Sequence, residues 1–342
     1  MAHQKTNQPV VAVTLGDPAG IGPELIARLL ARSDISNSAN VVLVGDAWLW
    51  ADAQKVAGID VATHPVTSFA EVRDRGDTSR PAFLAMDTVE AARVQRSQSG
   101  AAGGASVLRV LDACMDAAAG GKIDAICFAP LNKHAMKLGG LRHEDELHHF
   151  AEYLGVTGYF CEFNTLDGLW TCRISSHVPL ADVPRYITRE RIVAAAGLMV
   201  RSLQANGIAA PRVAVAGLNP HNGEGGTCGR EEIDVIEPAV RELNAAGLPV
   251  TGPFSADTIF LRARDGELDA IVTMYHDQGQ IAIKLMGFSR GVTVQGGLPI
   301  PITTPAHGTA YDIAGLGKAD VTATANAFQI AARMGLASRA RR

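Results

Sequence analysis

VVAVTLGDPAGIGPE, residues 10–24, is the stretch of sequence that indicates the fold class. Residues 10–15 form an apolar, β-branched run that is typical of a short buried strand. A glycine-rich turn follows, and a helical pattern occupies residues 24–32. Pro23 suits the first turn of that helix, where a missing N–H costs nothing. A strand that passes through a tight turn into a helix indicates an α/β protein.

The same alternation continues along the chain. Further strand-like runs occupy residues 41–44, 125–128, 212–216 and 270–274, and helical patterns occupy residues 105–118, 189–206 and 231–244. This order predicts parallel sheets covered by helices. At 342 residues the chain is too long for one minimal domain, so we expect two packed α/β domains.

Composition and charge exclude several classes of protein. The chain is 47% hydrophobic and 19% charged, as in ordinary soluble globular proteins. Its net charge of −4 comes without a basic block, which favours a small-molecule partner over nucleic acid. Five cysteines without a CxxC pair argue against a disulfide framework or a cysteine zinc site. The polar start and the lack of a bilayer-length apolar run lead us to expect a cytoplasmic protein with neither a signal peptide nor a membrane partner.

The turn at residues 16–24 has two interpretations. It opens a helix, and the N–H groups of such a turn are suited to binding a ligand. However, it matches neither the GxGxxG nor the Walker A pattern. A backbone that needs positive φ would explain its glycines equally well. The turn alone does not decide between these interpretations.

Three histidines directly follow strand-like runs and form a candidate metal site. His177 lies in SSHVPL, His221 in NPHNGEGG and His276 in MYHDQG. Ligands of parallel α/β proteins bind at the carboxyl ends of strands. Three neutral imidazoles that leave coordination positions open would form a catalytic divalent-metal site. A single histidine is more often a core or surface residue, so the hypothesis depends on all three together.

Two further segments carry polar residues in suggestive places. Residues 143–149, HEDELHH, are a poor match to the zinc-protease pattern HExxH, because Leu147 stands at the position of the second histidine. Residues 307–320, HGTAYDIAGLGKAD, contain small residues that allow a flat ligand to approach the backbone, and His307 or Asp312 would bind it by hydrogen bonds. A glycine-rich connection between domains is the alternative interpretation of the second segment.

Together these segments resemble the 4-hydroxythreonine-4-phosphate dehydrogenase family of vitamin B6 biosynthesis. The match extends from about residue 10 to residue 334 in consistent order, and NPHNGEGG and MYHDQG are its most specific motifs. HGTAYDIAG is also similar to the isocitrate and isopropylmalate dehydrogenases, whose fold this family shares. The resemblance implies two α/β/α domains with a cleft between them, and a homodimer with its active sites at the subunit interface.

The resemblance also implies domain bounds, metal ligands and cofactor contacts. We expect a discontinuous first domain of residues 1–125 plus 300–342, and a second domain of residues 126–299 that holds the metal and dimer-interface residues. His177, His221 and His276 match the three metal ligands of the family, with His276 reaching across from the partner chain. NAD or NADP would be bound, without a Rossmann fingerprint, by Gly296, His307, Gly308, Thr309 and Asp312.

The positions that match the family's substrate contacts depart from its pattern. The GHTE motif is here Arg142-His143-Glu144-Asp145, an asparagine of the family is Thr293, and a substrate-binding arginine aligns with Ile302. Loss of an arginine removes the preferred bidentate contact with phosphate or carboxylate, and an added glutamate repels anions. The implied substrate-binding set is His143, Glu144, Lys284, Thr293 and Ile302.

These inferences predict a metal-dependent, NAD(P)-dependent oxidation of a small hydroxy acid that resembles 4-hydroxythreonine 4-phosphate, with decarboxylation of the 3-oxo product. The divalent metal would be zinc, or else magnesium, cobalt or manganese, and would lower the pKa of the substrate hydroxyl. Asp257 and Lys284, which match active-site positions of the family, would transfer protons.

Other substrates and other classes of protein stay open. The same chemistry on 4-phosphothreonate or 4-phosphoerythronate is one alternative, and a non-phosphorylated cis-dihydrodiol dicarboxylate is another. An acyl-phosphate transferase such as phosphotransacetylase shares the general fold but needs neither the histidines nor a nicotinamide. A non-catalytic small-molecule binder is the third class, and the presence of all three histidines argues against it.

Overall fold

The computed structural model describes residues 8–75 and 77–341, which divide into two compact units. The first unit joins Met1–Thr157 to Val292–Arg342, and the second unit is Gly158–Gly291. The second unit is therefore inserted into the chain of the first.

The first unit is built on a mostly parallel sheet with the strand order β3-β4-β2-β1-β5-β12-β11. Its strands are β1 (Val10–Thr14), β2 (Asn40–Gly45), β3 (His64–Val66), β4 (Ala82–Ala85), β5 (Ala125–Phe128), β11 (Val292–Gly296) and β12 (Ile302–Pro305). Among these described strands, β11 is the one that pairs antiparallel, with β12. β1, β2 and β5 are buried along their whole length, as expected for strands covered on both faces.

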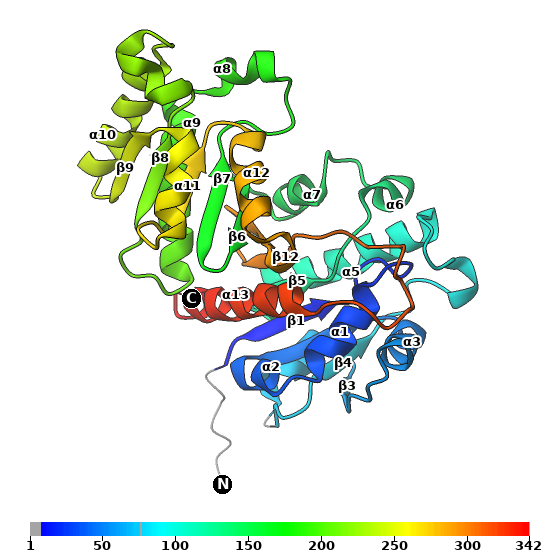
Figure 1. Ribbon diagram of the computed structural model, residues 1–342. Coiled ribbons are helices and arrows are strands. Elements are labelled where there is room, and N and C mark those ends of the chain that lie inside the picture. Colours follow the sequence, from blue (N-terminus) through cyan, green and yellow to red (C-terminus); the bar gives the residue numbers. More distant parts are fainter. Residues whose placement is uncertain (1–7, 76, 342) are drawn as a thin grey trace. The chain divides into compact units, whose positions relative to one another are not determined.

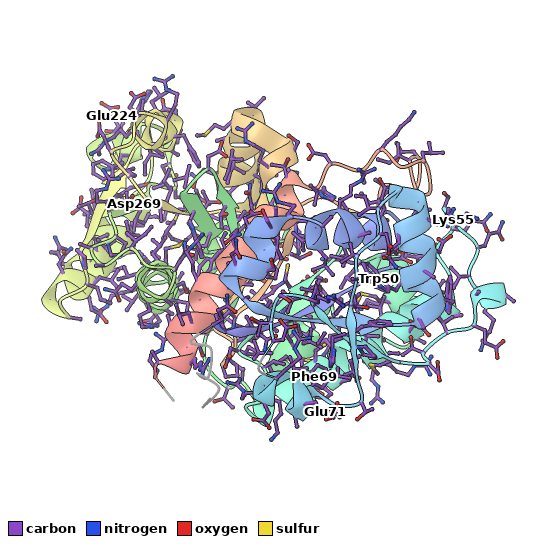
Figure 2. All side chains as sticks on the ribbon, turned by 90° about the horizontal axis from the view of Figure 1, so that it is seen from below. Trp50, Lys55, Phe69, Glu71, Glu224 and Asp269 are labelled. Atoms are coloured by element: carbon purple, nitrogen blue, oxygen red, sulfur yellow. The ribbon has the colours of Figure 1, made fainter. Side chains whose placement is uncertain are left out.

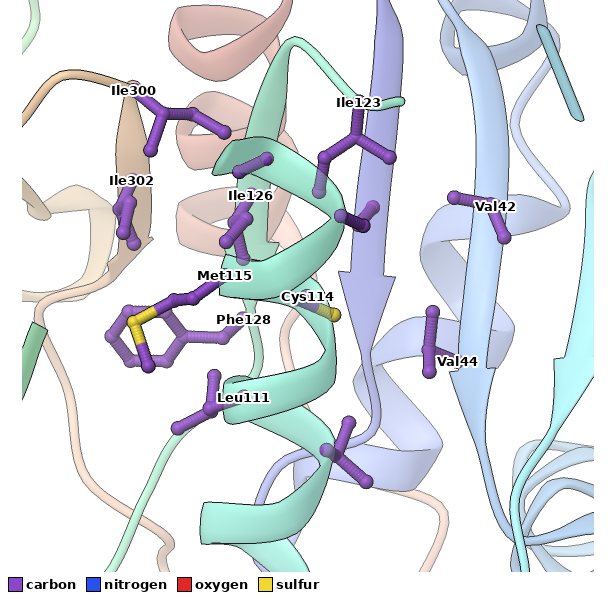
Figure 3. Close-up of a cluster of buried hydrophobic side chains, with 14 of the residues drawn as sticks. Val42, Val44, Leu111, Cys114, Met115, Ile123, Ile126, Phe128, Ile300 and Ile302 are labelled. Carbon is purple, nitrogen blue, oxygen red and sulfur yellow. The ribbon is translucent and has the colours of Figure 1, made fainter. Parts of the chain in front are cut away.

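Helices cover both faces of this sheet (Figure 1). They are α1 (Gly22–Leu30), α2 (Ser33–Ser38), α3 (Ala47–Ala57), α4 (Phe69–Asp74), α5 (Ala101–Ala119), α6 (Lys133–Leu138), α7 (Glu146–Tyr153) and α13 (Thr322–Arg339). Val10 and Ala12 share a hydrophobic cluster with Met115 of α5, which Figure 3 shows close to Phe128. Because side chains alternate across a strand, Val11 faces the opposite layer, where α13 packs against β1, β5 and β12.

The bounds of the units differ from those predicted, which divide the chain after residues 125 and 299. β5 pairs with β1, and the α6 and α7 that follow it pack against α5, so the first unit extends to Thr157. β11 pairs with β12, which places Val292 in the first unit as well.

The second unit has the strand order β6-β7-β10-β8-β9. Its strands are β6 (Cys161–Leu166), β7 (Leu169–Arg173), β8 (Val213–Ala216), β9 (Val250–Phe254) and β10 (Ala270–Thr273), and its helices are α8 (Val183–Tyr186), α9 (Arg189–Ala205), α10 (Glu237–Ala245), α11 (Ala256–Arg264) and α12 (His276–Gly287). β6 pairs antiparallel with β7, and the other described pairings are parallel. Ile259 and Phe260 of α11 share a hydrophobic cluster with Ala214 and Ile271 of the sheet and with Ala282 of α12.

The predicted α/β class with parallel sheets is confirmed. The five strand-like runs correspond to β1, β2, β5, β8 and β10 to within one residue at each end. The predicted helix at residues 231–244 is wrong in detail, because a π-helical turn, Glu232–Ile236, precedes α10. The strand-like runs did not include β3, β4, β6, β7, β9, β11 or β12.

The surface helices are amphipathic. On α3, Trp50 is buried and Lys55 is exposed, and Figure 2 labels both. A separation of five residues places these side chains on nearly opposite sides of a helix.

Over residues 8–75 and 77–341, no helix combines the length and the hydropathy that crossing a bilayer requires.

Ile302 belongs to the core of the first unit. Its side chain is fully buried beside Ile126, its β-sheet partner, and Figure 3 shows both with Ile300 and Phe128. An apolar residue is therefore what the packing at this position requires.

We expect Ile302→Ala to lower the free energy of unfolding by about 2–5 kcal/mol, because it removes buried methyl groups and leaves a cavity. The matched control is Leu138→Ala, since 52% of Leu138 is exposed on α6 of the same unit, and a change within about 0.5 kcal/mol is expected there. Urea unfolding followed by circular dichroism measures both. Equal losses in the two variants would contradict the buried position of Ile302.

Candidate active site

Parallel strand pairing places the three predicted metal ligands at one edge of the second unit's sheet. β7, β10 and β8 are neighbours in that order, and both pairings are parallel. His177 follows β7, His276 follows β10 and His221 follows β8, each within a few residues of the strand end. This is the edge at which open α/β sheets bind ligands.

His177 and His276 lie side by side at this edge. Their ring centroids are 5.8 Å apart, with the rings tilted by 42°. Both histidines line a cavity of about 300 Å³, together with their neighbours in residues 175–178 and 275–277 and with Leu180 and Val183. The structure therefore brings together two of the three histidines within one chain.

The orientation of His276 is fixed by a carboxylate. Nδ1 of His276 lies 2.7 Å from Oδ1 of Asp277. An Nδ1–H that donates to this carboxylate leaves Nε2 as the electron-pair donor, which is the usual arrangement of a metal-binding imidazole.

His221 lies in an unusual backbone segment. Residues 221–225 all have positive φ, including His221 (52°), Asn222 (57°) and Glu224 (47°). His177 also has a left-handed backbone, with φ of 51°. Each such non-glycine residue costs roughly 1–2 kcal/mol, and strain of this kind is retained mainly at functional sites. Oδ1 of Asn222 is buried and has no hydrogen-bond partner among the described residues.

Over the described residues of one chain, no three His, Cys, Asp or Glu side chains are close enough to hold a metal ion. The three-histidine site, including the reach of His276 to a partner chain, stays a prediction.

Glu232 is a buried carboxylate that lies against the segment that carries His221. It begins the π-helical turn, and 1% of the residue is exposed. Burial would raise the pKa of Glu232, but hydrogen bonds from Asn219 and Leu218 outweigh it and lower the pKa below the ordinary value. No pattern in the sequence indicates a role for this residue, although it lies only six residues beyond the NPHNGEGG motif.

Asp257 and Lys284, the predicted proton-transfer residues, lie on neighbouring helices. Asp257 is exposed in the first turn of α11, and Lys284 is exposed on α12, two turns beyond His276. Both helices pack on the same hydrophobic cluster, so the two side chains come from one face of the sheet.

In the first unit, the turn at residues 16–24 and the segment at residues 307–320 form one structure. The N–H of Ile21 donates to the carbonyl of Thr309 at 3.0 Å. The hydroxyl of Tyr311 donates to Oδ2 of Asp17 at 2.5 Å. A Cβ on Gly20 would lie 2.8 Å from Cβ of Thr309, so glycine is required for this close approach. Of the predicted cofactor residues, Gly308 and Asp312 are exposed and His307 is partly exposed, whereas Thr309 and Gly296 are buried.

The Asp17–Tyr311 pair was missed from the sequence because its members are 294 residues apart. Burial raises the pKa of the Asp17 carboxyl, and hydrogen bonds from Tyr311 and the Ala19 N–H offset part of the rise. Burial and the adjacent Asp17 carboxyl also raise the pKa of Tyr311.

The predicted substrate residues of the first unit do not share one environment. His143 precedes α7 and is partly buried, with Nδ1 3.5 Å from Oε2 of Glu152. Glu144 is exposed, Thr293 is buried on β11, and Ile302 is in the core. The turn before α7 ends at Asp145, whose side chain caps the helix by accepting the N–H of His148 at 3.0 Å.

The family model described as "Pyridoxal phosphate biosynthetic protein PdxA" matches residues 37–331. The chain belongs to the PdxA family. A Pseudomonas aeruginosa protein named "Putative 4-hydroxythreonine-4-phosphate dehydrogenase 2" is 51% identical over 329 residues, which cover 96% of this chain and 97% of that protein. A Symbiobacterium thermophilum protein named "Putative D-threonate 4-phosphate dehydrogenase" is 36% identical over 332 residues, 97% of this chain and 98% of that one.

Two solved structures extend the comparison. The 4-hydroxythreonine-4-phosphate dehydrogenase of Klebsiella pneumoniae has a TM-score of 0.84 and 33% identity, covering 97% of this chain and 99% of that one. The terephthalate 1,2-cis-dihydrodiol dehydrogenase of Burkholderia xenovorans has a TM-score of 0.66 and 29% identity, covering 92% and 98%. As a member of this dehydrogenase family, the protein is an oxidoreductase that acts on a CH–OH group.

We expect Asp17→Asn to change the pH dependence of stability. Because the pKa of Asp17 is raised above 3.8 in the folded protein, the folded state binds this proton more tightly than the unfolded chain does. The stabilisation is therefore present at low pH and is lost as pH rises through the raised pKa. The melting temperature of the wild type, relative to Asp17→Asn, should fall as pH increases from about 4.

The exposed Asp312 of the same segment provides the control, Asp312→Asn. A pH-independent difference between the wild type and Asp17→Asn would show that the raised pKa is wrong.

Proposed function

We propose that the protein catalyses the NAD(P)+-dependent, divalent-metal-dependent oxidation of a hydroxy acid of the 4-hydroxythreonine-4-phosphate or D-threonate-4-phosphate class, followed by decarboxylation of the 3-oxo acid. The observation that carries this proposal is the pair His177 and His276 over a cavity of about 300 Å³ at the carboxyl edge of the sheet. The names of the PdxA relatives supply the substrate class.

The side chains present fit a metal with imidazole ligands. His177 and His276 line the cavity, His221 follows the adjacent strand, and Asp277 orients His276. Imidazole ligands favour zinc or cobalt over magnesium and manganese, which prefer oxygen. When bound, such an ion supplies Lewis acidity that lowers the pKa of a coordinated hydroxyl and polarises a carbonyl.

The chain's own residues would bind the other reactants and transfer the proton. The exposed Gly308 and Asp312, with His307, would contact a nicotinamide cofactor, which would accept the hydride. Lys284 and Asp257 are the candidates for removing the hydroxyl proton, since both are exposed on one face of the second unit's sheet.

We further propose that the protein acts as a homodimer whose interface includes the region around the cavity. Leu180, which lines the cavity, is 70% exposed, and Ile281 and Leu285 on α12 are 58% and 84% exposed. The last two are one helical turn apart and form one stripe. Exposed apolar side chains that gather beside a site indicate a surface that another chain covers.

A cis-dihydrodiol dicarboxylate is the second candidate substrate. The exposed Glu144 places a negative charge before α7. A carboxylate there disfavours a phosphate at this position. The similarity to a terephthalate cis-dihydrodiol dehydrogenase supports this alternative. Membership of a dehydrogenase family disfavours the acyl-phosphate transferase.

We expect His276→Ala to lower kcat/KM by about 100-fold or more, because a lost metal contact removes several kcal/mol of transition-state stabilisation. NAD(P)H absorbance measures turnover, with and without Zn²⁺ or Co²⁺ after chelation. His64→Ala, which removes an exposed histidine of β3, should leave the rate unchanged. Undiminished turnover of metal-stripped His276→Ala would refute the metal role.

A substrate panel decides between the two substrate classes. We expect higher kcat/KM for 4-phosphorylated hydroxy acids than for their dephosphorylated forms or for cis-dihydrodiol dicarboxylates. The reverse order would transfer the proposal to the second candidate, and no NAD(P)H from any substrate would reject the dehydrogenase chemistry.

A further inference from the structure

The left-handed segment with His221 is anchored by the Glu232 carboxylate. Oε1 of Glu232 accepts the N–H groups of Leu218 and Asn219, both at 2.7 Å. Oε2 accepts Nδ2 of Asn219 at 3.0 Å. One buried side chain therefore satisfies both backbone donors that lead from β8 into the loop.

The carboxylate also contacts the left-handed turn itself. A Cβ on Gly223 would lie 2.6 Å from Oε2 of Glu232, so only glycine allows the carboxylate to approach this closely. Gly223 has φ of 79°, which glycine adopts without strain. Glu232 therefore lies directly against the left-handed turn of residues 221–225.

Gln278 connects this loop to the loop that carries His276. Its Oε1 accepts the N–H of Met274 at 2.7 Å, and its Nε2 donates to the carbonyl of Gly217 at 2.9 Å. The carbonyl of Met274 in turn accepts the N–H and the hydroxyl of Ser175, both at 3.0 Å. Hydrogen bonds thus join the loops after β7, β10 and β8 in sequence.

We propose that Gln278 and Glu232 are positioning residues, which hold the three histidine-bearing loops in a fixed relation and thereby set the affinity of the site for a divalent ion with imidazole ligands. The inference rests on the proposed function for the role of the metal. The geometry behind the inference does not depend on the proposed function. The chain of contacts joins Ser175, Met274, Gly217 and Glu232 whatever the ligand is.

The two side chains act in different ways. Gln278 uses one amide as both donor and acceptor, so Gln278→Glu keeps the size and the acceptor but places a carboxylate oxygen against the Gly217 carbonyl. Glu232→Gln keeps the shape but replaces one acceptor oxygen by an NH₂ group that faces N–H donors. Each substitution therefore breaks one defined link in the chain of contacts.

The test measures Co²⁺ binding to the metal-stripped, full-length protein by visible absorption. Hydrogen-bonded partners of metal ligands typically change metal affinity by about 10–100-fold, and we expect losses in that range for Glu232→Gln and Gln278→Glu. The control is Asp234→Asn. Asp234 lies on the same π-helical turn as Glu232, and its exposed carboxylate pairs with Arg230 at 2.9 Å. This variant should bind Co²⁺ like the wild type.

Hydrogen exchange of the metal-free protein gives a readout that does not depend on the ligand. Exchange of backbone amides over residues 217–228 should be faster in Glu232→Gln, and exchange near Met274 should also be faster in Gln278→Glu. Asp234→Asn should match the wild type. Gln278 is only partly buried, so Gln278→Glu should fold. If Glu232→Gln does not fold, Gln278→Glu still tests the inference.

A His221→Ala background separates positioning from general destabilisation. If Glu232 acts through His221, Glu232→Gln should lower the Co²⁺ affinity of His221→Ala no further. Equal Co²⁺ affinity in the wild type and both folded variants would overturn the inference, as would unchanged exchange. A wild type that binds no Co²⁺ would instead reject the proposed metal role and the inference with it.

Discussion

Parallel pairing of β7, β10 and β8 is the constraint on which the candidate site depends. Parallel neighbours end at the same edge, so residues that follow these strands are brought to one place although they are far apart in the sequence. The pairing is maintained by hydrogen bonds between strands that are almost completely buried. The strand order of the second unit is therefore what brings His177 and His276 close together.

Five of the buried strands were predictable, and the other strands were not. β7, β11 and β12 are also buried, but each carries polar residues that interrupt an apolar run. β1, β2, β5, β8 and β10 are apolar and fully or almost fully buried, so their composition alone identifies them. β3 exposes His64 and Pro65, and β6 carries polar residues such as Asn164, so neither has a continuous apolar run. The predicted helix over residues 231–244 includes a π-helical turn, in which Glu232 is buried and accepts hydrogen bonds, and helical periodicity does not reveal such a turn.

In the candidate site too, some residues were recognisable from the local sequence, whereas other contacts form only through the fold. His221 and His276 were identifiable because each follows a predicted strand within a few residues, whereas His177 follows β7, which the predicted runs did not include. Asp17 and Tyr311, and Gln278 and Gly217, became partners only through the fold, since nothing in the local sequence specifies a contact across 294 or 61 residues. Ile302 was assigned to the substrate by its place in a family pattern, whereas the packing around Ile126 places it in the core.

The insertion of the second unit into the chain of the first has a consequence for synthesis of the protein on the ribosome. When the ribosome has released the chain as far as Thr157, β5 still lacks β12, which pairs along its open side and begins at Ile302. The nascent first unit therefore presents the apolar edge of a central strand while the whole inserted unit is being translated. Unpaired edges of this kind promote association between chains. Delayed closure makes a holdase chaperone most useful during the synthesis of residues 158–301, before the sheet is completed.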